Sequence, residues 1–379
     1  MIRVGFLAPI TGPSAPIGQG LVNAAQMALF DAANNRFVLQ IYDTAGTPDG
    51  AATAAAAAVS HGARLLLGPL FAAEAKAVAA QADAAAIDVI SFSTDPSVAG
   101  GRVHVLGFLV RDQVREVVTH VRASGVSRFA VLAPNTIYGQ TVVDALSAIV
   151  PGSGGELTRI EYFDPSGSDL EDVVRRLANY DTRRAALDAQ RTELAAKTDE
   201  VSQLALKRLE RIDTTGDVDF DAIFIPEQGA RLAQAASLLS LYDVEPGRVQ
   251  LMGTMLWNSP NLGREPSMIG AMFPAPEPAA ARDFAARYRQ VYGTPPPPLA
   301  SHGYDAVALA SVLARAEGAS EAPFTRIALT NPAGFSGVDG IFRLRADGLA
   351  ERGFSVLQIT RAGAEVVKPA STAFTDPAY

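Results

Sequence analysis

The sequence predicts an α/β protein made of two doubly wound lobes, each built on a parallel sheet, with three hinge crossovers joining them. Three observations predict this fold. The chain has 379 residues, more than one hydrophobic core usually supports. Short apolar runs, typical of strands buried on both faces, alternate with Ala-rich helical stretches. The alternation restarts at residue 113, so we expect residues 1–112 and 279–337 to form the first lobe and residues 113–278 and 338–379 the second.

The first lobe opens with a regular alternation of strands and helices. We expect strands at 4–7, 37–42, 65–67 and 89–92, and helices at 19–33, 50–60 and 72–84. On the first of these helices, apolar residues fall on one face at intervals of three and four, namely Leu21, Ala25, Leu29 and Ala32. The alanines let the helix lie close to its strands, which indicates helices packed on a parallel sheet.

The second lobe repeats this order and contains an echo of the first. We expect strands at 129–132, 157–162, 222–225 and 249–253, and helices at 113–124, from 139, from 169 and at 229–241. Residues 7–11 (LAPIT) end the first strand of the first lobe, and residues 132–136 (LAPNT) end the corresponding strand of the second. Gly18 and Gly139 follow in the helices. Open α/β sheets present ligand sites at such strand-to-helix turns.

A charged, Leu- and Ala-rich stretch without Gly or Pro interrupts the second lobe at about 180–212. Tyr180, Leu187, Leu194 and Val201 recur every seven residues, but the companion positions are polar, so a narrow packing stripe is expected rather than a coiled coil. We expect a long helix or a helical hairpin. It either lies on its own lobe or provides a docking surface for a protein partner.

The last quarter of the chain predicts two further crossings between lobes. The Pro-rich strand at 272–276 breaks the alternation and is followed by helices at 279–292 and 302–317. Residues 341–344 and 354–360, with turns at 346–348 and 363, are typical of antiparallel strands. Three crossovers would let two rigid lobes rotate about a few backbone angles and close on a ligand.

The composition excludes several classes of function. With 32 Lys and Arg against 40 Asp and Glu, the chain has no basic surface for nucleic acid. The absence of Cys excludes disulfides, thiolate catalysis and Cys-ligated zinc. The four histidines are scattered, so we expect no metal, and the glycines near residue 18 miss the dinucleotide spacing, so we expect no cofactor.

One short segment carries the letters of a catalytic triad. Ser301, His302 and Asp305 stand almost next to one another where a helix is expected to open. Side chains this close in sequence point in different directions and cannot form a nucleophile–base chain, so the segment is interpreted as a helix N-cap. We expect that the protein is not an enzyme.

Four segments, in this order, resemble the type I periplasmic binding proteins, in particular the leucine/isoleucine/valine-binding branch. They are 8–13 (APITGP) with Gly18, 67–70 (LGPL), 90–96 (ISFSTDP) and 138–140 (YGQ). The resemblance spans nearly the whole chain. It implies non-catalytic binding of a small carboxylate-bearing, amino-acid-like ligand in the interlobe cleft, as the solute-binding component of an ABC importer that docks on a membrane permease.

The resemblance also implies which residues hold the ligand. Ser93 and Thr94, together with Leu70, Phe71 and Ala72, occupy the positions that supply hydroxyls and backbone N–H groups to a ligand carboxylate. Strand ends that feed helix N-termini favour an anion without Arg or Lys. The alternative for Ser93 and Thr94 is helix or turn capping.

In the second lobe, Tyr138 matches a tyrosine of the family that faces the cleft, with ordinary packing as the alternative. The chain departs from the family at two places. Ile17 stands where the branched-chain amino-acid binders have an aromatic residue, and the segment 253–258 lacks the acid that pairs with the ligand ammonium. Either Glu227 substitutes for that acid, or the ligand is not an amino acid, or Trp257 stacks on the cation.

These departures and the insertion also make the chain similar to the penicillin-binding protein activators of Gram-negative bacteria, which share the fold. In such a protein the cleft would be vestigial and the partner a peptidoglycan synthase. Either resemblance implies a periplasmic location, with a lipid anchor left open. Because a strand begins within the first residues and no apolar run of about 18 residues exists, we expect this sequence to lack its export leader and any membrane span.

Overall fold

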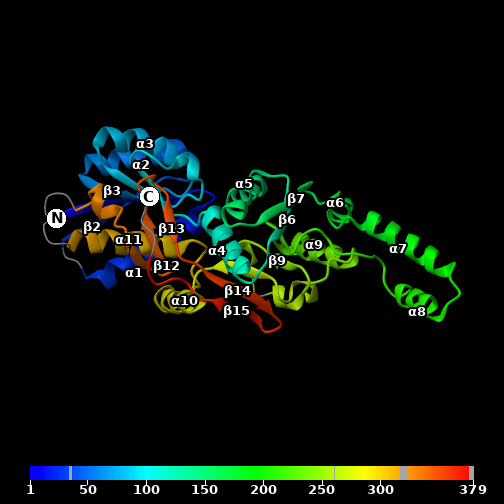
Figure 1. Cartoon of the computed structure of the whole chain (residues 1–379). Helices are drawn as coiled ribbons and strands as arrows, with labels where there is room; N and C mark the ends of the chain where they lie inside the picture. Colours follow the sequence, from blue (N-terminus) through cyan, green and yellow to red (C-terminus); the bar gives the residue numbers. More distant parts are fainter. Residues whose placement is uncertain (34–35, 260, 316–322, 375–379) are drawn as a thin grey trace. The chain divides into compact units, whose positions relative to one another are not determined.

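The computed structural model describes residues 1–33, 36–259, 261–315 and 323–374 (Figure 1). The chain divides into two compact units. The first comprises Met1–Asp112, Pro276–Phe354 and the chain from Ala370, and the second comprises Gln113–Ala275 and Ser355–Pro369. This division differs from the expected one, because residues 338–354 and 370–374 belong to the first unit. They do so because strands 340–344 and 350–352 bury Phe342, Leu344 and Ala350 in its core.

The first unit is built on a five-stranded parallel sheet of order β2-β1-β3-β4-β5. Its strands are β1 (Ile2–Ala8), β2 (Phe37–Asp43), β3 (Ala63–Leu67), β4 (Asp88–Ser91) and β5 (Val103–Val105). Its helices are α1 (Ala15–Ala32), α2 (Pro48–Ser60), α3 (Ala72–Ala85), α10 (Pro278–Tyr292), α11 (Ala300–Arg315) and α12 (Arg326–Leu329), with a 3-10 turn η1 (Pro96–Val98). A small antiparallel sheet of β11 (Phe335–Gly337), β12 (Gly340–Leu344) and β13 (Ala350–Arg352) completes it.

Helices cover both faces of this sheet, as the continuous apolar strands predict. Alternate residues of each strand point to opposite faces, so Phe6 packs with α1 and α11 while Leu7 packs with α2 and α3. The alanines of α2 let that helix approach the strands closely, since Ala51, Ala54, Ala55 and Ala58 are all buried. The unit is therefore doubly wound.

The second unit is built on a seven-stranded sheet of order β15-β14-β10-β9-β8-β6-β7. The five strands β6 (Arg128–Pro134), β7 (Glu156–Phe163), β8 (Ala222–Phe224), β9 (Gln250–Met252) and β10 (Met272–Ala275) run parallel. The antiparallel pair β14 (Ser355–Thr360) and β15 (Gly363–Lys368) extends the edge. The helices are α4 (Val110–Ala123), α5 (Ile137–Gly152), α6 (Leu170–Leu177) and α9 (Gly229–Leu241), with 3-10 turns η2 (Met255–Trp257), η3 (Leu262–Arg264) and η4 (Pro266–Met268).

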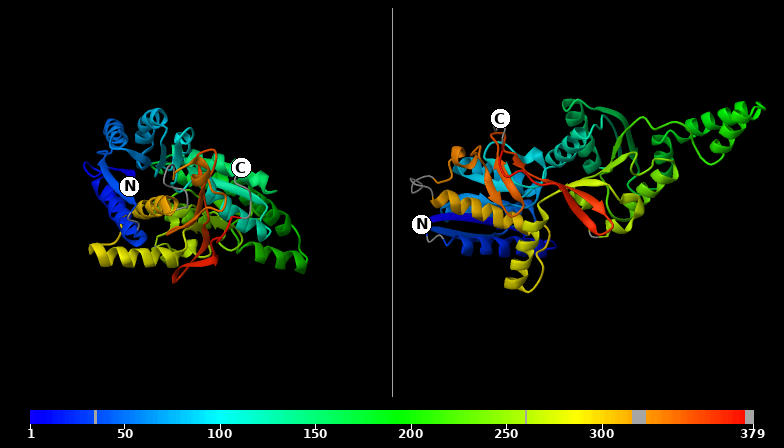
Figure 2. Two further views of the ribbon diagram at one scale, coloured as in Figure 1. Left: turned by 90° about the vertical axis from the view of Figure 1, so that its left-hand side faces the viewer. Right: turned by 60° about the horizontal axis from the view of Figure 1, so that its bottom comes forward.

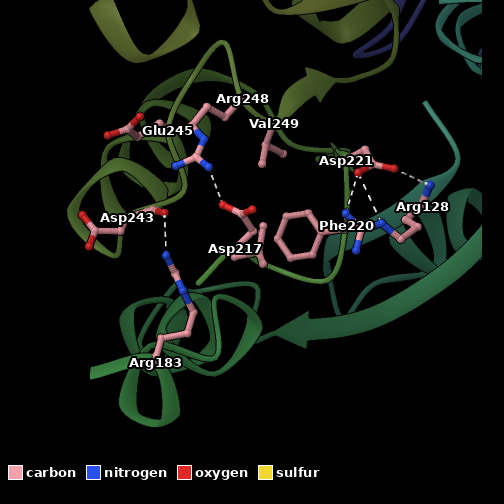
Figure 3. Close-up of a pocket in the computed structure, with 10 residues that line it drawn as sticks. Arg128, Arg183, Asp217, Phe220, Asp221, Asp243, Glu245, Arg248 and Val249 are labelled. Atoms are coloured by element: carbon pink, nitrogen blue, oxygen red, sulfur yellow. Dashed lines mark hydrogen bonds and ion pairs between the residues drawn. The ribbon is translucent and has the colours of Figure 1, made fainter. Parts of the chain in front are cut away.

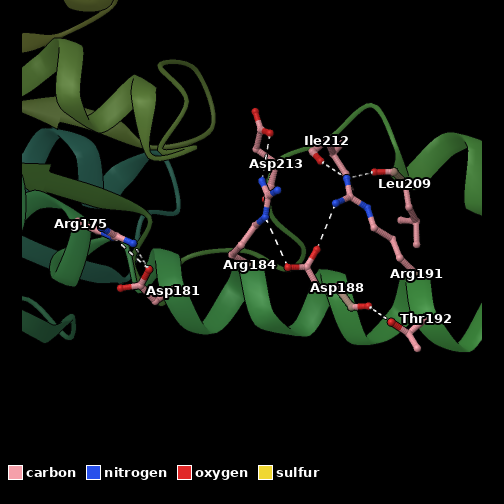
Figure 4. Close-up of polar contacts among 9 residues, drawn as sticks. All are labelled: Arg175, Asp181, Arg184, Asp188, Arg191, Thr192, Leu209, Ile212 and Asp213. Atoms are coloured by element: carbon pink, nitrogen blue, oxygen red, sulfur yellow. Dashed lines mark hydrogen bonds and ion pairs between the residues drawn. The ribbon is translucent and has the colours of Figure 1, made fainter.

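The insertion forms the hairpin alternative, with α7 (Tyr180–Ala195) and α8 (Glu200–Leu209) antiparallel to each other. Figure 2 shows these two green helices extending away from the sheet of the second unit. Leu187 is fully buried, but Val201 is 79% exposed, so the expected seven-residue stripe does not continue into α8. Polar contacts close the hairpin: Arg191 donates to the carbonyl oxygens of Leu209 and Ile212, both at 2.8 Å (Figure 4).

Arg183 fastens the base of this hairpin to the rest of the second unit. Its guanidinium donates to four backbone carbonyl oxygens, those of Gly216 (3.2 Å), Ala178 (3.3 Å), Tyr242 (3.4 Å) and Asp243 (3.4 Å). These carbonyls belong to the end of α6, the chain returning from α8 and the end of α9. The side chain is buried, and burial lowers the pKa of Arg183.

The sequence echo of the two lobes corresponds to the same close contact in each unit. A Cβ on Gly18 would overlap the carbonyl oxygen of Pro9, and a Cβ on Gly139 would overlap that of Pro134. In both units the first turn of a helix therefore rests directly on the proline that follows or ends the first strand. Any side chain at either glycine would push the helix away from the strand end.

Candidate functional site

Each parallel sheet reverses its strand order at one place. In the first unit β1 lies between β2 and β3, and in the second β6 lies between β7 and β8. Helices leave such a switch point toward opposite faces, which opens a crevice at the carboxyl ends of the strands. The loops after β1 and β3, and those after β6 and β8, are the ones that the sequence singled out. We call the loops at the switch point of each unit the half-site of that unit.

The loop after β1 is held by an acid that the sequence did not single out. The Asp43 carboxylate accepts hydrogen bonds from the backbone N–H groups of Ile10 (2.9 Å), Thr11 (3.2 Å) and Ala45 (2.8 Å), and from the Thr11 hydroxyl (2.6 Å). Burial opposes ionisation, but these hydrogen bonds prevail and lower the pKa of Asp43. Asp43, at the end of the adjacent strand β2, therefore fixes this loop, and the Thr11 hydroxyl is already hydrogen-bonded to it.

The loop after β3 differs from expectation at Phe71. Its backbone N–H donates to Glu74 Oε2 at 2.9 Å, because Glu74 stands in the first turn of α3 and reaches back to the residue before the helix. The Phe71 N–H is thus already used and is not available to a ligand carboxylate. Glu74 is fully buried, and this burial raises the pKa of its carboxyl group against the hydrogen bonds from Thr44, Phe71 and Leu70.

Two further residues proposed for the first half-site are engaged in packing. Leu70 is buried in the main core of the unit, and Ile17 is half-buried against the same core. Ala72 is partly buried and begins α3, so helix geometry leaves its N–H without an intrahelical acceptor. The Phe71 ring is 36% exposed and offers an apolar surface beside this N–H group.

The loop after β4 is a chain of hydroxyl contacts. Ser91 Oγ donates to the Pro69 carbonyl (3.0 Å) and accepts from the Ser93 N–H (3.2 Å), while Ser93 Oγ accepts from the Asp95 N–H (3.1 Å). The Ser93 oxygen therefore caps the turn, as the capping alternative expects. Its hydroxyl proton remains available to donate, and Thr94 is exposed next to it. Ser93 can therefore cap the turn with its oxygen and still donate its hydroxyl proton to a ligand.

In the second unit, Tyr138 is held by the loop after β9. Its hydroxyl donates to Thr254 Oγ1 at 2.8 Å, and the adjacent Met255 N–H donates to Gln113 Oε1 at 3.0 Å. Burial raises the pKa of Tyr138, the hydrogen bond to Thr254 opposes the rise, and the charge of Glu227 adds to it. The Tyr138 hydroxyl thus stays protonated and can still accept a hydrogen bond.

Trp257 contacts the backbone of Glu227, but its ring belongs to the core and not to a ligand site. The Trp257 indole N–H donates to the Glu227 carbonyl oxygen at 3.0 Å. The ring is fully buried in the core of the second unit, and it lies flat against Gly253, where a Cβ would overlap it. The expectation that Trp257 stacks on a ligand is therefore wrong for this ring, which already packs on protein.

The Glu227 side chain remains as the acid of the second half-site. Its Oε1 accepts from the Gln228 N–H at 2.9 Å, and its Oε2 lies 3.7 Å from Arg231 Nε. The side chain is 14% exposed. Burial is the main cause of the raised pKa of Tyr138, and the charge of Glu227 adds to it. An acid and a tyrosine hydroxyl thus share the switch point of this sheet.

A separate charged pocket lies at the opposite, amino ends of β6, β8 and β9 (Figure 3). It has a volume of about 150 Å³. Arg128 pairs with Asp221 at 2.7 Å, and this hydrogen bond lowers the pKa of Asp221 to about 2. Arg248 pairs with Asp217, and Arg183 is held by backbone carbonyls. The three arginines that line this pocket are thus each already engaged by protein groups.

Within the described residues, no group of three or more His, Asp or Glu side chains is placed to hold a metal ion. Among the same residues, no helix combines the length and the apolar character that crossing a membrane requires.

A family model described as "Periplasmic binding protein" matches residues 1–364, and the chain belongs to this family. The family consists of periplasmic, solute-binding proteins. Among curated proteins, the chain is similar to the Leu/Ile/Val-binding protein BraC3 of Rhizobium johnstonii, with 28% identity over 188 residues, 46% of this chain and 51% of that protein. The match spans about half the length of the curated relatives it reaches.

Solved structures show the same fold over almost the full chain. One is a candidate branched-chain amino acid ABC transporter from Rhodospirillum rubrum, with a TM-score of 0.75, 18% identity and coverage of 97% of this chain and 99% of that one. Another is a solute-binding protein of an ABC transporter from Rhodopseudomonas palustris, in complex with 3,4-dihydroxybenzoic acid, with a TM-score of 0.61, 15% identity and coverage of 100% and 97%. The predicted fold of two parallel-sheet lobes is confirmed.

Proposed function

We propose that this protein is the solute-binding component of an ABC importer and takes a small, carboxylate-bearing, amino-acid-like ligand. One observation carries the proposal: the two half-sites bear complementary groups. The first offers hydroxyl and amide donors from Ser93, Thr94 and Ala72, and the second offers the Glu227 carboxylate beside the Tyr138 hydroxyl. The donors of the first unit suit the carboxylate of an α-amino acid, and the acid of the second suits its ammonium.

The second half-site also supports the expectation that Glu227 substitutes for the acid that the family carries in the segment 253–258. The segment 253–258, where the family carries its acid, is used here to bury Trp257. Glu227 approaches the same switch point from the neighbouring strand, because β8 and β9 pair directly. An ammonium group buried without a partner would cost several kcal/mol, so an amino-acid ligand requires Glu227.

The ligand class is tested by thermal shift and titration calorimetry with L-leucine and 3,4-dihydroxybenzoate as probes. An amino acid should raise the melting temperature of the wild type, because a ligand that binds the folded state stabilises it. Glu227→Gln should weaken L-leucine binding by about thirtyfold, or about 2 kcal/mol. It should leave the benzoate, which has no ammonium, unchanged.

Two controls separate the half-sites. Glu193→Gln removes an exposed acid that pairs with Lys197 at 2.8 Å on the hairpin, and it should change neither probe. Ser93→Ala should weaken both probes, because both carry a carboxylate. Failure of L-leucine and other amino acids to bind, with the benzoate binding normally, would shift the proposal to aromatic acids. Binding of neither class would remove it.

The hairpin favours a second candidate function, regulation of a peptidoglycan synthase through protein contacts. Val201 and Leu204 stand three residues apart on α8 and are 79% and 55% exposed, so they offer a small apolar surface that a protein partner could cover. Replacing residues 185–210 by a short turn keeps Arg183 and its carbonyl partners. If the second function holds, this variant loses a synthase that the intact protein retains in a pull-down, and equal retention excludes it.

A further inference from the structure

The segment 301–305, interpreted above as a helix N-cap, lies inside α11, and two of its side chains are buried in the first unit. His302 and Asp305 are 0% and 1% exposed. Asp305 Oδ1 accepts a hydrogen bond from the Val338 N–H at 2.6 Å, in the turn between β11 and β12. A Cβ on Gly337 would overlap the Asp305 carboxyl group, so this carboxyl group lies in direct contact with the turn.

A second buried acid, Asp339, stands in the same turn. Asp339 is 6% exposed, and its charge acts on Asp305. The Oδ2 atom of each acid accepts no hydrogen bond from any described residue. The cation of the group is Arg352 at the end of β13, whose Nη1 lies 3.6 Å from Asp305 Oδ2. Two buried carboxyl groups therefore share one guanidinium, so full ionisation would leave one negative charge unbalanced.

The other titratable groups facing this cluster do not supply the missing positive charge. Burial and the charge of Arg352 lower the pKa of His302 well below its usual value, so this ring stays neutral, and it stands edge-on to Phe108 at 4.6 Å. Asp112 adds a carboxylate, because its Oδ2 accepts from the Arg352 N–H at 3.3 Å. The Ser301 hydroxyl hydrogen-bonds to Asp339.

The acids consequently hold a proton to unusually high pH. Burial and the charge of Asp339 raise the pKa of Asp305 from 3.8 to about 7, although Arg352 opposes the rise, and burial raises the pKa of Asp339 as well. Because the folded value exceeds the unfolded one, the stabilisation from the bound proton is complete below pH 3.8. It is lost as the pH rises through about 7.

The cluster lies where the chain leaves the first unit, which it does after Asp112 and again after Phe354. Arg352 Nε donates to the Leu106 carbonyl oxygen at 3.2 Å, and its guanidinium lies 4.9 Å from the centre of the Phe108 ring. The Phe108 and Phe354 rings are 5.9 Å apart. One arginine thus joins the segments 106–112 and 352–354 and is also the cation beside the buried acids.

We propose that Asp305 and Asp339 share a single proton and, through Arg352, form a pH-sensitive switch on the segments 106–112 and 352–354. While the proton is bound, the pair carries one negative charge, which Arg352 balances while holding Leu106. When the proton leaves, a second carboxylate competes for the same guanidinium. The contacts of Arg352 with 106–112 then weaken, and the chain loosens at the two places where it leaves the first unit.

Amide hydrogen exchange at pH 5.5 and 8.5, corrected for the intrinsic exchange rate, tests the switch in the full chain without ligand. In the wild type, protection of 106–112 and 352–354 should fall about tenfold between these values, the change that one pKa unit of proton linkage produces. Asp305→Asn removes the titrating charge and should abolish this fall. Asp31→Asn is the matched control, because Asp31 accepts from Tyr304, next to Asp305, but is exposed.

The outcomes decide for or against the switch. A fall that is present in the wild type and in Asp31→Asn but absent in Asp305→Asn supports it. Equal protection of the wild type at both pH values overturns it, and so does a fall that persists in Asp305→Asn. If Asp305→Asn does not fold, Asp339→Asn replaces it with the same expectation, since either change leaves one acid for Arg352 to balance.

Discussion

Arg183 offers the sharpest test of how the helical insertion is fastened. Replacing it with Ala removes four hydrogen bonds to the backbone oxygens of Ala178, Gly216, Tyr242 and Asp243. The pocket beside it admits water to the vacated carbonyls, so each bond counts near the ordinary net value of about 1 kcal/mol. The unfolding free energy should therefore fall by about 4 kcal/mol.

Urea denaturation followed by far-UV circular dichroism measures this loss. Arg183→Lys keeps the charge but cannot reach four carbonyls in a plane, and it should cost about 2 kcal/mol. Arg191→Ala is the matched control, because all partners of Arg191 lie within the insertion. They are the carbonyls of Leu209 and Ile212 and the exposed Asp188 carboxylate, so the same reasoning gives a smaller loss of about 2 kcal/mol. A loss for Arg183→Ala below about 0.5 kcal/mol, or equal to that of Arg191→Ala, would refute the reasoning.

Three further changes test the second unit. Gly139→Ala should cost about 2–4 kcal/mol in urea unfolding, because its Cβ would overlap the carbonyl of Pro134, whereas a cost near zero would mean that α5 shifts freely. Trp257→Phe removes the hydrogen bond to Glu227 and part of a buried ring, so the melting temperature should fall by several degrees; an unchanged value contradicts this packing. Leu187→Ala should destabilise the hairpin, seen as faster proteolysis there, and unchanged cleavage would show that its polar contacts suffice.

The fold was largely predictable because buried parallel strands are written as continuous apolar runs. Strands β1 to β4 and β6 to β10 lie at or next to the expected positions. The strands β5 (VHV), β11 (FSG) and β13 (AER) are three residues long and contain polar, charged or Gly residues, so no continuous apolar run marks them in the sequence. The domain boundary at 338–354 was misplaced because an antiparallel alternation shows which face is buried but not which core buries it.

The candidate site was predictable only in part. The alternation of strands and helices placed the strand-to-helix turns, and the resemblance to the family selected Ser93 and Tyr138 at such turns. Glu74 escaped notice because the usual capping pattern requires Ser or Thr three residues earlier, and Phe71 stands there. The sequence could not decide whether Trp257 stacks on a ligand or fills the core, since both uses need the same ring.

The contact of Gly18 with Pro9 and of Gly139 with Pro134 has a bearing on ligand capture. Each helix that opens beside a half-site is seated on main-chain atoms of its own unit, so its position does not depend on whether a solute is present. These two turns have little ordering left to undergo when a solute binds, so their own share of the entropy lost on association is small. Selectivity then resides in the side chains around these rigid turns, which can vary while the turns themselves stay the same.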